Sequence, residues 1–122
     1  MWQGYVIPKS LPEAVEALAA SPGESRIVAG ATDLILELER GVRRGVHTLI
    51  DISRVPGLGA IELRGGRIHL GPLTTHNVVA ASGVIQKHAL SLAQACWEVG
   101  APQIRNRATI AGNLITASPA ND

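Results

Sequence analysis

The sequence predicts an α+β protein in which a small βαβ unit precedes an antiparallel hairpin and further helices. Two observations predict this fold class. Residues 25–52 have the pattern of a strand, a helix and a second strand, and such strands run parallel with a right-handed crossover between them. Two short apolar runs then flank Gly65 and Gly66, a dipeptide typical of the turn in an antiparallel hairpin.

Elements of the first half follow from local signals. Residues 10–13, Ser-Leu-Pro-Glu, are typical of a helix start, because serine and glutamate at this spacing cap free backbone N–H groups. They predict a helix over residues 11–20. The β-branched run at 25–29 predicts a buried strand. Helical spacing over 32–45, ending at one of the two glycines there, and a strand at 48–52 complete the βαβ unit.

The second half of the chain has a different pattern of predicted elements. Residues 60–64 and 67–71 are the two predicted hairpin strands, and helical patterns follow at 75–81 and 89–98. After Gly100 the chain is rich in Asn, Thr, Gly and Ser, which predicts irregular structure to the last residue.

Size and composition limit the classes of function. With 122 residues, 46% of them hydrophobic, the chain suits one globular domain or two small subdomains. Eleven basic residues against ten acidic ones leave a net charge of +1 without a basic patch, which argues against a nucleic-acid partner. The single cysteine, Cys96, lies in an apolar helical stretch and predicts a buried thiol in a reducing compartment.

The start of the chain carries no targeting signal. Residues 1–4 lack the charged and apolar regions of a signal peptide, and no uninterrupted apolar run is long enough to span a bilayer. These features predict a soluble cytoplasmic protein.

The first segment that could carry chemistry is a small-residue turn between the strand at 25–29 and the helix after it. A turn of this kind directs free backbone N–H groups at whatever lies above it, and phosphate suits such a site. The alternative is structural: Gly30 allows a tight turn and Thr32 or Asp33 caps a helix. The Gly-x-Gly-x-x-Gly dinucleotide motif is absent. The candidate binding residues are Val28, Ala29, Gly30, Ala31, Thr32, Asp33 and Leu34.

The second segment lies near the end of the chain. Its hydroxyl, glycine and amide groups suit a phosphorylated or polyhydroxylated ligand, and Asp122 offers an acceptor for a ribityl or ribose hydroxyl. An ordinary polar loop would have the same composition. The candidate binding residues are Thr109, Ile110, Ala111, Gly112, Asn113 and Asp122.

Other polar residues give weaker signals. The four histidines lack the spacing of metal ligands, so they are predicted at the surface or on the hairpin, and no metal site is expected. They are His47, His69, His76 and His88. Arg105 and Arg107 suit either phosphate or the carbonyls and carboxylates of a domain seam. Trp97 is predicted in the core.

Four stretches of the sequence, taken together, indicate a protein family more specifically than any one of them does. Residues 28–34, Gly71-Pro72-Leu73-Thr74-Thr75, 100–106 and 108–114 resemble, in order and spacing, the FAD subunit of the xanthine dehydrogenase and carbon monoxide dehydrogenase family of molybdenum hydroxylases. The resemblance implies FAD extended between a small α/β subdomain and a larger, mainly antiparallel one. The predicted βαβ unit and hairpin agree with that split.

The resemblance also implies residue roles. It assigns residues 1–56 to the small FAD-binding subdomain and 57–122 to an incomplete second one. It makes residues 28–34 the first pyrophosphate loop and 109–113 the second, and it puts the Asp122 carboxylate near the flavin. Ala31 and Ala111 stand where the family commonly has glycine, so each needs an ordinary backbone angle or carries strain. We expect both alanines to be tolerated.

Function and partners follow from the same resemblance. A flavin subunit of this family takes electrons from [2Fe-2S] clusters on a small subunit, which a molybdopterin subunit has reduced, and passes them to an acceptor such as NAD. No catalytic side chain is expected, because the cofactor supplies the redox chemistry. The chain is shorter than the family's flavin domain, so we expect a C-terminal portion, or a chain supplying it, as a partner. The alternative is a truncated, flavin-free interaction or assembly module.

Overall fold

The computed structural model describes residues 2–30, 39–41 and 45–117. These residues form two compact units, Met1–Pro56 and Gly57–Asp122. Each unit is described by itself. The helix expected over 32–45 lies largely outside the described residues.

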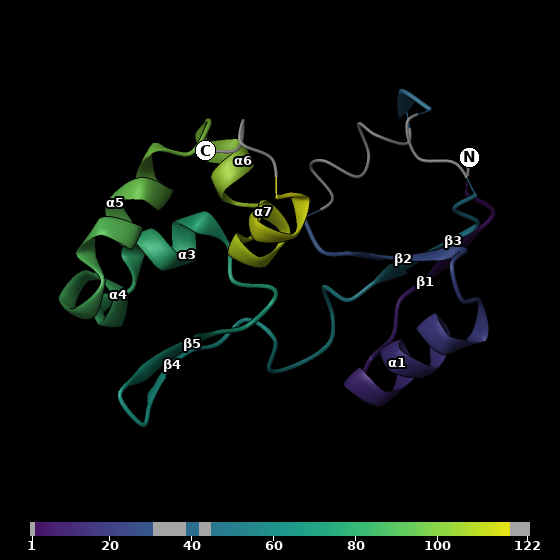
Figure 1. The fold of residues 1–122 in the computed structure, drawn as a ribbon, viewed down its shortest axis with the longest axis horizontal. Helices are drawn as coiled ribbons and strands as arrows, with labels where there is room; N and C mark the ends of the chain where they lie inside the picture. The colour runs from purple at the N-terminus through teal and green to yellow at the C-terminus, as the bar shows by residue number, and fades with distance from the viewer. Residues whose placement is uncertain (1, 31–38, 42–44, 118–122) are drawn as a thin grey trace. The chain divides into compact units, whose positions relative to one another are not determined.

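The first unit contains a three-stranded parallel sheet with α1 (Leu11–Ala20) along one face (Figure 1). The strand order is β1 (Gly4–Val6), β3 (Thr48–Asp51), β2 (Ser25–Val28), so the last of this sheet's strands along the chain lies at its centre. The parallel pairing of β2 with β3 confirms the predicted βαβ arrangement. Strand β1 was not predicted, because three residues carry too little alternation of apolar and polar side chains to indicate a strand.

Capping fixes where α1 begins. Ser10 Oγ accepts a hydrogen bond of 3.2 Å from the N–H of Glu13, and Glu13 Oε2 accepts one of 2.9 Å from the N–H of Lys9. Both free donors at the helix start are therefore satisfied from within the predicted motif. The helix has the predicted bounds.

The core of the first unit lies on the central strand. Ile50 is fully buried and Leu49 is 3% exposed. Leu49 clusters with Val28 and Val46, and Trp2 packs against the cluster. Two adjacent residues of one strand point to opposite faces, so β3 is covered on both sides, as expected for a parallel sheet.

The second unit begins with the predicted hairpin. Strands β4 (Ile61–Arg64) and β5 (Arg67–Leu70) pair antiparallel, with Ile61 opposite Leu70. The turn uses Gly65 at φ 56° and Gly66 at φ 74°, the two positive angles that suit the twist of a two-residue hairpin turn. The hairpin prediction is confirmed.

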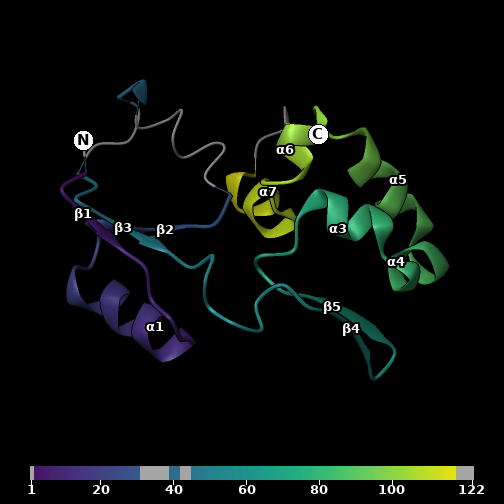
Figure 2. The ribbon, with the colours of Figure 1, turned by 180° about the vertical axis from the view of Figure 1, so that it is seen from behind.

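Five helices follow among the residues that the structure describes (Figure 2). They are α3 (His76–Ala81), α4 (Gly83–His88), α5 (Leu90–Glu98), α6 (Pro102–Arg105) and α7 (Ile110–Thr116). The predictions of α3 and α5 are confirmed. Helix α4, which starts on a glycine, was not predicted. The expectation of irregular structure after Gly100 is wrong, because α6 and α7 form there.

The core of the second unit joins helices to the hairpin. Val79, Ile85, Ala93 and Cys96 form its buried cluster, and apolar residues of β4 and β5 pack against it. Burial raises the pKa of the Cys96 thiol. The adjacent Trp97 is 65% exposed, so its prediction as a core residue is wrong. Neighbouring helical positions point about 100° apart, and Cys96 takes the inward one.

Candidate functional site

The described part of the first glycine segment, residues 28–30, follows directly from β2 at the carboxyl end of the parallel sheet. Val28 is opposite Asp51 in the register, and its carbonyl accepts a hydrogen bond of 3.0 Å from the N–H of Ile52. Strand pairing therefore fixes the chain up to Val28, and the small residues Ala29 and Gly30 begin the turn. The other four candidates, Ala31, Thr32, Asp33 and Leu34, lie outside the described residues.

A carboxylate lies beside this strand end. Asp51 Oδ1 accepts a hydrogen bond of 2.9 Å from the N–H of Ser53, and the hydroxyl of Tyr5 donates to Asp51 Oδ2. Partial burial raises the pKa of Asp51, but the hydrogen bonds from Ser53 and Tyr5, with the charge of Arg54, outweigh it and hold the pKa below its ordinary value. The side chain ties β1 to the end of β3.

The second glycine segment, residues 109–113, is the start of a helix. Thr109 is the N-cap of α7: its Oγ1 accepts a hydrogen bond of 3.0 Å from the N–H of Gly112, and its carbonyl accepts one of 3.1 Å from Asn113. Ala111 lies inside α7, and Ala117 is the only non-glycine with positive φ among the described residues. Ala111 therefore has an ordinary backbone angle and needs no glycine there. Asp122 lies outside the described residues.

Close packing against Thr109 explains why residue 112 is a glycine. A Cβ added to it would lie 2.9 Å from Thr109 Oγ1, closer than carbon and oxygen normally approach. A side chain at position 112 would therefore push against the hydroxyl that caps the helix. The hydrogen bond from Thr109 at the start of α7 therefore requires a residue without a side chain at position 112.

A second stretch of chain, residues 74–76, holds the start of this segment. Thr75 and Thr109 form an isolated antiparallel bridge. The N–H of Ile110 donates to the carbonyl of Thr74 over 3.2 Å, and the N–H of His76 donates to the carbonyl of Ala108 over 3.1 Å. We call residues 74–76 the clamp segment.

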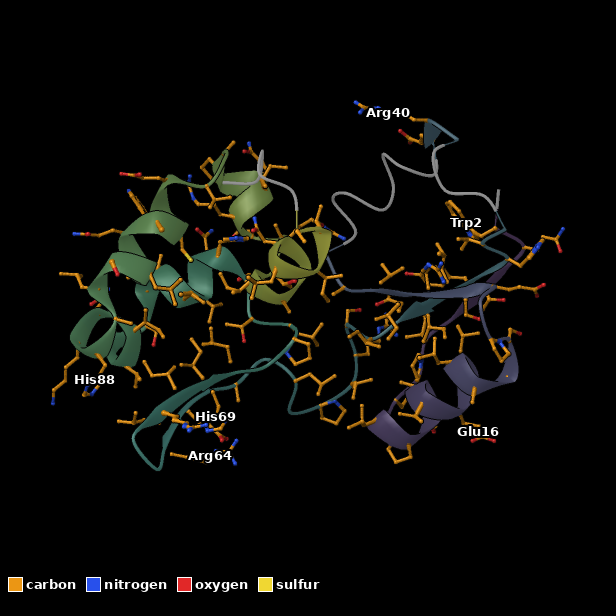
Figure 3. The ribbon with its side chains drawn as sticks, in the orientation of Figure 1. Trp2, Glu16, Arg40, Arg64, His69 and His88 are labelled. Carbon is orange, nitrogen blue, oxygen red and sulfur yellow. The ribbon has the colours of Figure 1, made fainter. Side chains whose placement is uncertain are left out.

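His76 adds a side-chain contact to the clamp segment. Its ring nitrogen Nδ1 lies 2.9 Å from the carbonyl oxygen of Ala108, and its side chain is buried with 3% exposure. The prediction of a position at the surface or on the hairpin is wrong for His76. Its partner is 32 positions away, so no local pattern signals the contact. His47, His69 and His88 are exposed, and Figure 3 shows His69 on β5 and His88 at the end of α4.

Arg105 binds carbonyl groups. Its Nη1 donates to the carbonyls of Val99 and Gly100, each over 3.2 Å, and its Nε donates to Asn77 Oδ1 over 3.3 Å. Its guanidinium also lies over the ring of Trp97, 5.1 Å from the ring centre. Of the two interpretations left open by the sequence, the structure supports carbonyl binding for Arg105.

The described residues contain no group of three or more His, Cys, Asp or Glu side chains that could hold a metal ion. No helix in this part of the chain is long and apolar enough to cross a membrane.

Comparison with protein families identifies the family to which a chain with these two segments belongs. Residues 2–122 match the family model described as the FAD binding domain in molybdopterin dehydrogenase. The chain belongs to this family. The membership confirms the resemblance drawn from the glycine segments and the α+β fold class, and it relates the chain to subunits of oxidoreductases.

Curated relatives in this FAD-binding family extend beyond the chain. The carbon monoxide dehydrogenase medium chain of Hydrogenophaga pseudoflava is 34% identical over 118 residues, covering 97% of this chain and 41% of that protein. The nicotinate dehydrogenase FAD-subunit of Eubacterium barkeri is 38% identical over 120 residues, covering 97% and 40%. The chain thus spans about two fifths of the length of these relatives.

Solved structures share the fold. The carbon monoxide dehydrogenase from Hydrogenophaga pseudoflava matches with a TM-score of 0.92 and 32% identity, over 100% of this chain and 42% of that one. Quinoline 2-oxidoreductase from Pseudomonas putida 86 matches with a TM-score of 0.91 and 26% identity, over 100% and 42%. The parallel sheet, the antiparallel pair and the helices therefore match the N-terminal part of such a flavin subunit.

Proposed function

We propose that this chain binds FAD as part of the medium subunit of a molybdenum hydroxylase-type oxidoreductase. In that role the complex relays electrons from [2Fe-2S] clusters to an external acceptor such as NAD, and FAD supplies the redox chemistry. The observation that carries the proposal is the match of residues 2–122 to the FAD-binding family. The chain's own residues bind and orient the cofactor.

Residues of the second glycine segment fit a pyrophosphate. The N–H groups of Ile110 and Gly112 are bound by Thr74 and Thr109, whereas the N–H of Ala111 has no partner among the described residues. Ala111 and Gly112 add little bulk, so a phosphate oxygen can reach the main chain. The N–H of Ala111, free among the described residues, and the low bulk around it support residues 109–113 as the second pyrophosphate loop.

The first glycine segment supports the proposal by its place in the sheet. Ligands of open α/β sheets bind beyond the carboxyl ends of the strands, where residues 28–30 lie. We propose residues 28–34 as the first pyrophosphate loop and Asp122 as a carboxylate near the flavin. Residues 1–56 and 57–122 would then be the two FAD-binding subdomains.

The names of the relatives support a place in a complex of several subunits. The related proteins are a medium chain and an FAD-subunit. We propose that the partners of this chain are a molybdopterin subunit, a [2Fe-2S] subunit and the remaining portion of a flavin subunit.

The visible spectrum of the protein, purified with its partner subunits, tests the proposal. We expect flavin absorption bands that persist through gel filtration. Ala111→Asp places a negative charge beside the proposed phosphate and should weaken FAD binding at least about tenfold. Ala95→Asp, on the exposed side of α5, is the matched control and should bind FAD as the parent does. A colourless parent complex that takes up no added FAD would refute the proposal and favour a flavin-free assembly module.

A further inference from the structure

His76 binds the carbonyl of Ala108 through both its main chain and its side chain. The Ala108 carbonyl accepts two hydrogen bonds, 3.1 Å from the main-chain N–H of His76 and 2.9 Å from its Nδ1. A carbonyl oxygen only accepts, so Nδ1 is the protonated ring nitrogen. One buried residue therefore supplies both partners of the carbonyl that precedes the second glycine segment.

This contact acts at the point where the segment starts. Ala108 is followed by Thr109, which caps α7 and is paired with Thr75, and by Ile110, whose N–H is bound to Thr74. A shift of the Ala108 carbonyl would move Thr109 and the N–H groups after it. The geometry of the segment thus depends on His76 through the main chain.

The residue after His76 fixes the other side of the same loop. The amide of Asn77 donates to Asn106 Oδ1, and Asn77 Oδ1 accepts from Arg105 Nε over 3.3 Å. The first turn of α3 therefore holds the chain at both 105–106 and 108. A purely apolar residue would fill the buried position of His76 without making the side-chain hydrogen bond to the Ala108 carbonyl.

We propose that His76 is a positioning residue for cofactor binding: its ring N–H orients residues 108–113 so that their main chain meets the FAD pyrophosphate. The inference rests on the proposed function. His76 itself contacts the Ala108 carbonyl and needs no contact with the cofactor.

Two substitutions separate the ring N–H from simple packing. His76→Leu keeps an apolar body of similar size and removes the donor. His76→Asn places an amide nitrogen near the position of Nδ1 and retains it. His69→Leu, at an exposed position on β5, is the matched control.

The experiment measures two quantities on the protein purified with its partner subunits. The first is the dissociation constant for FAD, from quenching of flavin fluorescence, and the second is hydrogen exchange of the peptide that contains residues 108–113. We expect His76→Leu to weaken FAD binding about three- to tenfold and to speed exchange of this peptide by a similar factor. His76→Asn should restore both to within about twofold of the parent, and His69→Leu should change neither.

The outcomes distinguish the inference from the proposed function. If the parent binds no FAD, the proposed function fails, and the exchange data still decide whether His76 orders the segment. Parental affinity and parental exchange in His76→Leu would overturn the positioning role. So would equal loss in His76→Leu and His76→Asn, because the ring N–H would then not be the feature that matters.

Discussion

The two glycine segments are held in place by different means. Residues 28–30 continue a strand of a parallel sheet, and the main-chain bond from Ile52 to Val28 extends the strand pairing to the edge of the turn. Residues 109–113 start a short helix and are held by the clamp segment, which comes more than thirty positions earlier in the chain.

The two segments therefore differ in which residues fix their conformation. A strand end is fixed by main-chain bonds that almost any side chain permits. The second segment depends on a few particular residues: the cap Thr109, the ring of His76 and glycines at crowded positions. Single substitutions should therefore disturb the second segment more than the first.

The largest expected effect comes from Gly71, which leads into the clamp segment. A Cβ at this position would lie 2.1 Å from the backbone carbonyl oxygen of Leu58. That oxygen is held in place by the hydrogen bond of 2.8 Å that it accepts from the N–H of Leu73. We expect Gly71→Ala to lower the free energy of unfolding by about 2–4 kcal/mol. Urea unfolding followed by circular dichroism measures it.

Gly59→Ala is the control for this prediction. Gly59 belongs to the same stretch of chain, and nothing lies within 4 Å of the Cβ it would gain. The change should shift the free energy of unfolding by less than about 0.5 kcal/mol. Equal effects of the two alanines would show that the approach of Gly71 to Leu58 does not constrain the clamp segment.

A smaller effect is expected at the cap of α7. Thr109→Ala removes the acceptor for the Gly112 N–H and should cost about 1 kcal/mol, whereas Thr109→Ser keeps the hydroxyl and should cost much less. Thermal unfolding compares the two variants. If Ser and Ala destabilise the protein alike, the methyl packing of Thr109 matters more than its hydrogen bond.

Much of the fold follows from local chemistry in the sequence. The Ser10 and Glu13 cap, the hairpin glycines and the apolar runs of the sheet are signals within a few residues, and the elements they predict are present. Local chemistry gave a wrong prediction after Gly100, where irregular structure was expected. Threonine, glycine and asparagine over 109–113 favour turns, yet here Thr109 caps a helix whose start is bound to the clamp segment.

The parts that could not be predicted are contacts between distant positions. Nothing near His76 in sequence indicates that its ring meets the Ala108 carbonyl, and nothing near Trp97 indicates that Arg105 lies over its exposed ring. Membership of the FAD-binding family supports the glycine segments as a site.

The smallest expected effect belongs to the first segment and depends on pH. The pKa of Asp51 is lowered in the folded state, so its carboxylate stabilises the fold fully above the unfolded value of about 3.8. This contribution is lost as the pH falls through the lower, folded pKa. Asp51→Asn should remove that acid-dependent part, about 1 kcal/mol or less because the side chain is partly exposed. Urea unfolding at a series of pH values measures it.

Tyr5→Phe provides a graded comparison with Asp51→Asn. It removes the hydroxyl that donates to Asp51 but leaves the bond from the Ser53 N–H, so it should reduce the acid-dependent part without abolishing it. An acid dependence identical in the parent and in Asp51→Asn would mean that other carboxylates cause it. The Asp51 carboxylate would then add no measurable stability to the strand end beside residues 28–30, which would widen the contrast with the side-chain-dependent second segment.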